Sequence, residues 1–221
     1  MLNKTQVKIC CISSIEEAML AIKFGASAIG LVSEMPSGPG VINEELIAEI
    51  VTKVNPSIGT FLLTSKQKAD EIIRQQLKTK VNTLQLVDNV PFDELKILKR
   101  ELPEIKLLQV IHVIDENSLE EAIDVSKYVD ALLLDSGNPN LKVKELGGTG
   151  RTHDWKISRS IVEKVNAPVF LAGGLSSQNV LEAIKKVKPY GVDICSGVRT
   201  DDKLDEEKLK TFFQQVCNYT H

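Results

Sequence analysis

The sequence predicts a (β/α)8 barrel, because short apolar segments alternate with helical segments along the whole chain. Eight such strand–helix units fit within 221 residues, a length at which α/β barrels commonly form one domain. Most of the short segments are continuously apolar, which is typical of parallel strands that are covered on both faces. We therefore expect a single-domain TIM barrel over residues 1–221, with an open doubly wound sheet as the alternative.

The first unit shows the pattern that the others repeat. An apolar strand over residues 7–11 precedes a helix over residues 14–24, which Ser13 or Ser14 can cap and Gly25 can end. The other predicted strands are 28–32, 58–63, 83–87, 107–113, 129–135, 168–172 and 192–195. The other predicted helices are 44–54, 66–77, 92–101, 118–127, 155–165, 177–186 and 206–216.

Composition excludes several classes of function. The net charge of -3 argues against a nucleic-acid-binding surface, which is usually basic. No apolar segment approaches the roughly 20 residues that span a bilayer, and the N-terminus lacks a signal-peptide apolar block. We therefore expect a cytoplasmic protein without nucleic-acid or membrane partners. The four cysteines form no C-x-x-C pair, so neither a zinc site nor a thioredoxin-type motif is expected. Because the cytosol is reducing, a disulfide framework is not expected either.

Three glycine-containing turns follow apolar segments in the last third of the chain. They lie at residues 147–150, 173–174 and 196–197. Glycine lets a ligand approach the main-chain N–H groups. Two of the turns lead into helical sequence, and a helix N-terminus attracts anions. The sequence therefore predicts a phosphate-binding pocket.

Two strand ends carry a good acid or base, Cys10 and Asp135. The active site of such a barrel lies at the C-terminal ends of its strands. Side chains alternate along a strand, so Lys8 and Cys10 share one face, and we expect Cys10 to point into the barrel and Cys11 into the core. Cys10 and Asp135 would then face each other across the barrel mouth, where a thiolate can take a proton and a carboxylic acid can give one. Their alternative roles are a buried thiol and a loop cap.

Two internal histidines are predicted to be structural rather than catalytic. We expect His153 to precede the sixth helix, with Asp154 as the N-cap of that helix. His112 lies in an apolar strand, where a hydrogen-bonded barrel residue is the expected role.

These features together resemble phosphoribosylanthranilate isomerase, a (β/α)8 enzyme of tryptophan biosynthesis. Lys8-Ile9-Cys10 is similar to the first-strand signature of that family, and Leu133-Leu134-Asp135 is similar to the strand that carries its general acid. GGTGRTHDW at 147–155 resembles its sixth loop. LAGGL at 171–175 and GVDICSGV at 191–198 resemble its last two units.

The resemblance implies an Amadori rearrangement of N-(5-phosphoribosyl)anthranilate without a metal or an organic cofactor. Asp135 would protonate the furanose ring oxygen, and Cys10 would then remove the proton from the sugar C2. It implies a small phosphorylated substrate as the partner of a monomer or homodimer. The main-chain residues implied to hold the phosphate are Gly148, Gly173, Gly174, Ser196 and Gly197.

Four departures from the family pattern leave the acid, the base and the glycine turns unchanged, and two of them, the missing arginine and the missing histidine, concern the other end of the substrate. Cys11 stands where the family has glycine, and Arg199 stands where it has glutamate. The loop 35–40 lacks the arginine that would grip the anthranilate carboxylate, and no histidine follows Leu86. Arg199 or Arg151 could supply a substitute cation. Two alternatives therefore stay open: an isomerase of another phosphorylated aminosugar, and a barrel that binds a phosphorylated metabolite without converting it.

Overall fold

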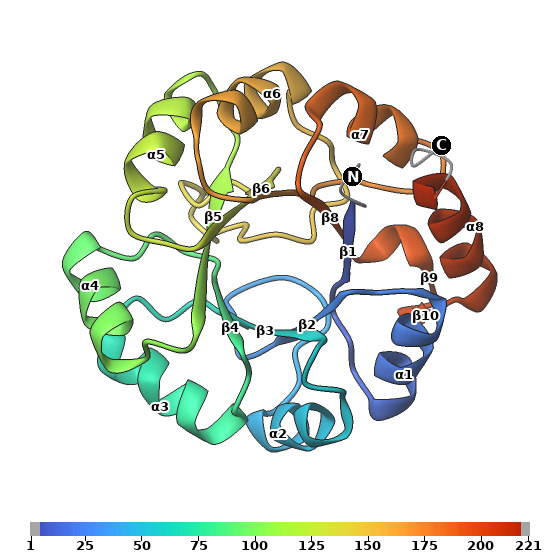
Figure 1. The fold of residues 1–221 in the computed structure, drawn as a ribbon, viewed down its shortest axis with the longest axis horizontal. Coiled ribbons are helices and arrows are strands. Elements are labelled where there is room, and N and C mark those ends of the chain that lie inside the picture. The colour runs from blue at the N-terminus through green and yellow to red at the C-terminus, as the bar shows by residue number, and fades with distance from the viewer. Residues whose placement is uncertain (1–4, 218–221) are drawn as a thin grey trace.

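A closed barrel of parallel strands inside a ring of helices forms the molecule (Figure 1). The computed structural model describes residues 5–217. The barrel strands are β1 (Gln6–Ile9), β2 (Ala28–Val32), β3 (Gly59–Thr64), β4 (Thr83–Leu86), β5 (Lys106–His112), β6 (Ala131–Asp135), β7 (Val169–Leu171) and β8 (Gly191–Ile194). The helices are α1 (Ile15–Phe24), α2 (Glu44–Lys53), α3 (Ala69–Thr79), α4 (Phe92–Glu101), α5 (Asn117–Val125), α6 (Trp155–Lys164), α7 (Val180–Val187) and α8 (Glu206–Cys217). Because β1 pairs with both β2 and β8, the predicted (β/α)8 architecture is confirmed and the open sheet is excluded.

Alternate residues of each strand point to opposite sides of the barrel wall. On β6, Leu132 and Leu134 pack in the layer between the strands and the helices, whereas Leu133 lies in the cluster inside the barrel. Phe61 and Phe170 meet inside the barrel edge to face, with ring centroids 6.1 Å apart. The barrel interior is therefore a packed core. Among the described residues, one pocket opens at the C-terminal ends of the strands and another at their N-terminal ends.

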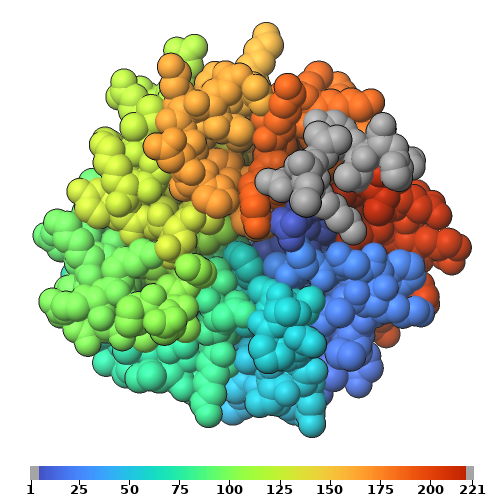
Figure 2. All heavy atoms as spheres, viewed as in Figure 1, coloured from blue at the N-terminus to red at the C-terminus, as the bar shows by residue number. Residues whose placement is uncertain are grey.

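The helices follow one another around the barrel in chain order. The last helix, α8, consequently lies beside the first, α1, and the red end of the chain meets the blue end (Figure 2). Within residues 5–217, no helix is long and apolar enough to cross a membrane.

Capping residues fix the helix ends where the sequence predicts them in the first unit. The Ser14 hydroxyl accepts a hydrogen bond from the Glu17 N–H, and Gly25 ends α1 with φ of 110°. Helix α7 begins later than predicted, at Val180. The reason is a preceding turn, in which the Asn179 side chain accepts a hydrogen bond from the Ser176 N–H.

A small hairpin after β8 was not predicted from the sequence. Strands β9 (Arg199–Thr200) and β10 (Lys203–Leu204) pair antiparallel across Asp201 and Asp202. Both aspartates have positive φ, 47° and 59°, as a type I′ hairpin turn requires. The charged segment between β8 and α8 is therefore partly ordered as a ribbon.

Candidate active site

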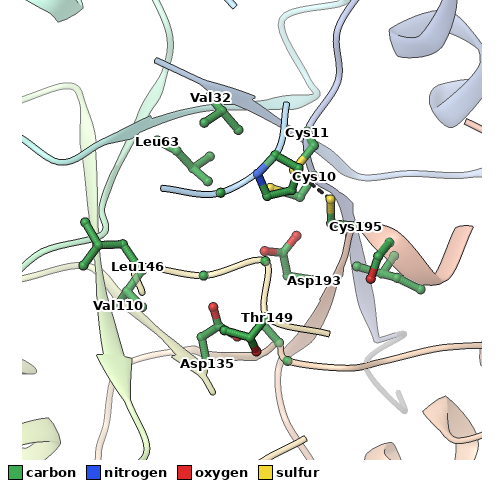
Figure 3. A pocket seen from close by; sticks show the side chains of 18 of the residues that line it. Cys10, Cys11, Val32, Leu63, Val110, Asp135, Leu146, Thr149, Asp193 and Cys195 are labelled. Carbon is green, nitrogen blue, oxygen red and sulfur yellow. Dashed lines mark hydrogen bonds between the residues drawn. The ribbon is translucent and has the colours of Figure 1, made fainter. Parts of the chain in front are cut away.

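A pocket opens at the C-terminal ends of the strands, and it brings together residues from most of the chain (Figure 3). Cys10 and Asp135 both line it. Of the five residues implied to bind phosphate, Gly148, Gly173, Gly174 and Ser196 line it as well. In the close view Cys10 and Asp135 lie on opposite sides, with Asp193 between them (Figure 3). The predicted juxtaposition of thiol and carboxyl across the mouth is therefore present.

Cys10 extends strand β1 by one residue and is buried in the pocket wall. Its backbone N–H donates a hydrogen bond to the Ile194 carbonyl at 2.8 Å, which fixes it beside β8. The thiol has room because the neighbouring residue of β2 is glycine. A Cβ atom on Gly30 would lie 2.8 Å from Cys10 Sγ and 2.9 Å from Lys8 Nζ. The sulfur and the ammonium thus lie less than about 6 Å apart, a range in which charges interact strongly.

Lys8 is fully buried beneath Cys10, and its ammonium lies 2.9 Å from Asp193 Oδ2. Burial alone would lower the pKa of Lys8. The carboxylate of Asp193, with the nearby Cys10 sulfur, outweighs burial and raises that pKa well above its ordinary value. Lys8 therefore carries a fixed positive charge, and such a charge stabilises a negative charge on a neighbouring sulfur. Asp193 was not predicted from the sequence as a site residue, although a charged residue in the middle of an apolar strand was the available signal.

Asp135 is the last residue of β6 and is 8% exposed. Its Oδ1 accepts a hydrogen bond from the Ser136 N–H at 2.8 Å. Two glycines leave the carboxyl open to the pocket, because a Cβ on Gly147 would lie 2.9 Å from Oδ2 and one on Gly173 would lie 3.1 Å from Oδ1. Side chains at those two positions would therefore crowd the carboxyl group.

Cys11 does not point into the core, and that prediction was wrong. Its φ is 60°, in the left-handed region, so the alternation of the strand ends there and the side chain turns toward the pocket. Its Sγ accepts a hydrogen bond from Cys195 Sγ at 2.7 Å. Contacts with the Cys10 and Cys195 thiols, together with burial, raise the pKa of Cys11 far above its ordinary value, so Cys11 stays a neutral thiol.

Neither arginine that could replace the missing cation is free. The guanidinium of Arg199 donates to both carboxylate oxygens of Glu17, at 2.9 and 3.1 Å, and to the Cys11 carbonyl. Arg151 forms an ion pair with Glu145 on the pocket rim. Among the described residues that line the pocket, none is a lysine, an arginine or a histidine.

The three glycine turns converge on one side of the pocket. Gly148, Gly173 and Gly174 have φ of 67°, 80° and 60°, values that side-chain-bearing residues rarely adopt. Gly197 does not line the pocket. It lies in a 3-10 helix, η1 (Ser196–Val198), where a Cβ would lie 2.1 Å from the Leu175 carbonyl oxygen, so close packing requires glycine there.

The two internal histidines make structural contacts, as predicted. His153 Nε2 lies 2.7 Å from the Ser158 hydroxyl in α6, and burial lowers the pKa of His153. Asp154 caps the same helix by accepting a hydrogen bond from the Lys156 N–H. His112 Nε2 lies 3.0 Å from the Val87 carbonyl oxygen.

The opposite side of the pocket is apolar, a feature that was not predicted from the sequence. Val32, Leu63, Val110 and Leu146 line it, away from the three cysteines (Figure 3). These residues come from three strands and one loop, so no local sequence pattern joins them. Within residues 5–217, no group of three or more His, Cys, Asp or Glu side chains is arranged to hold a metal ion. The site thus offers a thiol, a carboxyl group, glycine turns and an apolar wall.

Known proteins are similar to this chain in sequence and in fold over almost their whole length. A family model described as N-(5'phosphoribosyl)anthranilate (PRA) isomerase matches residues 7–215. The N-(5'-phosphoribosyl)anthranilate isomerase of Methanosarcina acetivorans is 36% identical, over 98% of this chain and 95% of its own. That of Methanocella arvoryzae is 35% identical, over 96% and 98%. The solved structure of the Pyrococcus furiosus enzyme is 29% identical, with a TM-score of 0.80 over 97% and 99% of the two chains. The chain belongs to the N-(5'-phosphoribosyl)anthranilate isomerase family.

Proposed function

We propose that Asp135 and Cys10 carry the two proton transfers of the family's reaction, which converts N-(5'-phosphoribosyl)anthranilate into a 1-amino-1-deoxyketose. One observation carries the proposal. A carboxyl group and a thiol face each other across a pocket in which three glycine turns also meet. The four departures in sequence leave all of these groups in place.

Asp135 acts first, as the acid. Its proton goes to the furanose ring oxygen, the bond from that oxygen to C1 breaks, and the nitrogen lone pair forms the C1=N bond of an iminium ion. The ring oxygen leaves as the C4 hydroxyl group. General acid catalysis of this kind contributes about 10²–10⁴ in rate. The hydrogen bond from the Ser136 N–H holds the carboxyl group in place for this transfer.

Cys10 acts second, as the base. Its thiolate takes the proton from C2, and the C2–H electrons form the C1=C2 bond while the iminium nitrogen becomes neutral. The resulting enolamine tautomerises to the C2 ketone. C1 is reduced and C2 is oxidised within one molecule, so the electrons balance without an external redox partner. The Lys8 ammonium lies close to this sulfur, since both would contact a Cβ atom on Gly30.

The two ends of the pocket suit the two ends of this substrate. Main-chain N–H groups at the turns of Gly148, Gly173, Gly174 and Ser196 would bind the phosphate, since glycine permits close approach and η1 and α7 begin nearby. The apolar wall would bind the aryl ring. A phosphorylated aminosugar without an aromatic group would leave that wall uncovered, which favours the arylamine over the alternative substrates.

Two experiments separate this function from the alternatives. Expression of the chain should restore growth of a tryptophan auxotroph that lacks the isomerase, and the purified protein should convert N-(5'-phosphoribosyl)anthranilate. Growth failure combined with turnover of another phosphorylated aminoaldose would indicate the paralogous isomerase. Binding of phosphorylated sugars without any turnover would indicate the non-catalytic barrel.

A further inference from the structure

Lys144 is close in the chain to the apolar wall of the pocket, and it contacts the β2–α2 loop and the β4–α4 loop. It lies in the loop between β6 and α6, two residues before the wall residue Leu146. Its backbone carbonyl accepts a hydrogen bond from the hydroxyl of Ser37, which itself lines the pocket. Its ammonium lies 2.5 Å from Asp88 Oδ2, in the loop that follows β4. Neither Lys144 nor Asp88 lines the pocket itself, and their ion pair joins the β6–α6 loop to the β4–α4 loop just outside it.

The described side chains that line the pocket offer no positive charge to an anion beside the apolar wall. Its described lining contains two carboxyl groups, Asp135 and Asp193, and no cationic side chain. An anionic group placed there without a partner would be desolvated at a large cost. The substrate of this family carries such a group, because the aryl ring of anthranilate bears a carboxylate. The glycine turns lie on the other side and are needed for the phosphate.

Lys144 is better placed for this role than the other cations near the pocket. Arg199 is bound by Glu17, and Lys8 is fully buried against Asp193. The backbone of Arg151 packs against the turn at Gly173 and Gly174, on the side assigned to the phosphate. The Lys144 side chain is 41% exposed, whereas Asp88 is 8% exposed. An ammonium has three donors, and Asp88 takes one of them. The remaining two can donate to a second carboxylate.

Asp88 is itself fixed, so it can aim the lysine. Its Oδ1 accepts a hydrogen bond from the Asn89 N–H, and its backbone carbonyl accepts one from the Gln109 side chain. A flexible lysine stem gains a defined position from such an anchor.

We propose that Lys144 binds the carboxylate of the substrate's aryl group, with Asp88 as its positioning residue. The inference rests on the proposed function and names the residue that makes the site specific for an ortho-carboxylated arylamine. It predicts that this chain recognises the carboxylate from the β6–α6 loop, although its β2–α2 loop carries no arginine.

The test compares two substrates that differ only in the carboxylate. They are N-(5'-phosphoribosyl)anthranilate and N-(5'-phosphoribosyl)aniline. Lys144→Ala should raise KM for the anthranilate substrate by roughly 10- to 100-fold, as expected for the loss of a charged hydrogen bond. The same variant should convert the aniline substrate as the wild type does. Lys144→Arg should recover part of the loss.

Lys142→Ala is the matched control, because Lys142 is an exposed lysine of the same loop. It should behave like the wild type with both substrates. Asp88→Asn should raise KM for the anthranilate substrate alone, by less than Lys144→Ala does, with kcat nearly unchanged. Circular dichroism would establish that each variant is folded.

Three results would overturn the proposal. They are an unchanged KM in Lys144→Ala, an equal loss with both substrates, and an equal loss in Lys142→Ala. In each case wild-type turnover of the anthranilate substrate leaves the proposed function standing. Absence of that wild-type turnover would instead overturn the proposed function, and this inference with it.

Discussion

The ammonium of Lys8 lies 2.9 Å from the carboxylate of Asp193, and the two residues are directly paired neighbours on β1 and β8. The strands that close the barrel are therefore joined by a buried ion pair at the floor of the pocket. Lys8 is fully buried and Asp193 is 7% exposed. Removing one partner of such a pair leaves an uncompensated charge, whereas replacing both with apolar residues is often tolerated.

Lys8→Met should therefore destabilise the protein by about 3–5 kcal/mol, because the Asp193 carboxylate would lose its partner. Urea denaturation followed by circular dichroism measures the change in the free energy of unfolding. Lys8→Met combined with Asp193→Leu should recover most of the loss. A double variant no more stable than Lys8→Met would show that the ion pair is not the cause.

Gly40→Ala should destabilise the protein by about 1–3 kcal/mol. The φ of Gly40 is 77°, and an added Cβ would lie 2.5 Å from the Cβ of Cys11. Gly150→Ala is the control, since Gly150 has φ of 67° and nothing within 4 Å of the added atom. Gly150→Ala should introduce backbone strain without a steric contact, so it should lower the free energy of unfolding by less than Gly40→Ala does. Equal losses in the two variants would mean that the contact with Cys11 is unimportant.

The ion pair between Glu17 and Arg199 should make stability depend on acid pH. Burial alone would raise the pKa of Glu17. Hydrogen bonds from Arg199 and from the Leu204 and Ser13 N–H groups outweigh burial and hold that pKa below its ordinary value of 4.5. A depressed folded-state pKa contributes stability that is fully present above pH 4.5 and is lost as the pH falls through the lowered value.

Glu17→Gln should therefore lower the free energy of unfolding at neutral pH and flatten its fall below pH 4.5. Urea denaturation of both proteins over a series of pH values measures this difference. A variant whose unfolding free energy falls with pH as steeply as that of the wild type would assign the acid sensitivity to other groups.

The sequence was sufficient to predict the barrel and the inward direction of its strands. Hydrophobic segments of strand length recur eight times, and a strict period of two places Lys8, Cys10 and Asp135 on inner faces. The glycine turns were visible because glycine marks backbone conformations that other residues avoid. Strand periodicity and glycine turns depend on residues that are close in the chain, so they can be predicted from short stretches of sequence.

The remaining features depend on packing between distant segments. A single left-handed residue, Cys11, reversed the expected side of its thiol. The available signal was that the family has glycine at this position, since glycine adopts positive φ readily. The apolar wall and the contacts of Lys144 join loops and strands far apart in the chain. Arg199 looked available in the sequence, yet Glu17, which binds it, lies 182 positions away.

The binding and chemical roles of the pocket should be separable in Asp135→Asn. This variant should lose turnover, since the amide has no proton to give to the ring oxygen, and yet bind ribose 5-phosphate as the wild type does. Isothermal titration calorimetry measures that binding. Loss of ribose 5-phosphate binding in Asp135→Asn would show that the carboxyl group also serves as an anchor.

Steady-state turnover of N-(5'-phosphoribosyl)anthranilate by purified Cys10→Ser tests the central claim most directly. The hydroxyl of serine is a far weaker base than a thiolate held beside the buried Lys8 ammonium. We expect a folded protein whose kcat falls by a factor on the order of 10² or more. A folded Cys10→Ser variant with the kcat of the wild type would contradict the account, because the proton at C2 would then leave by another route.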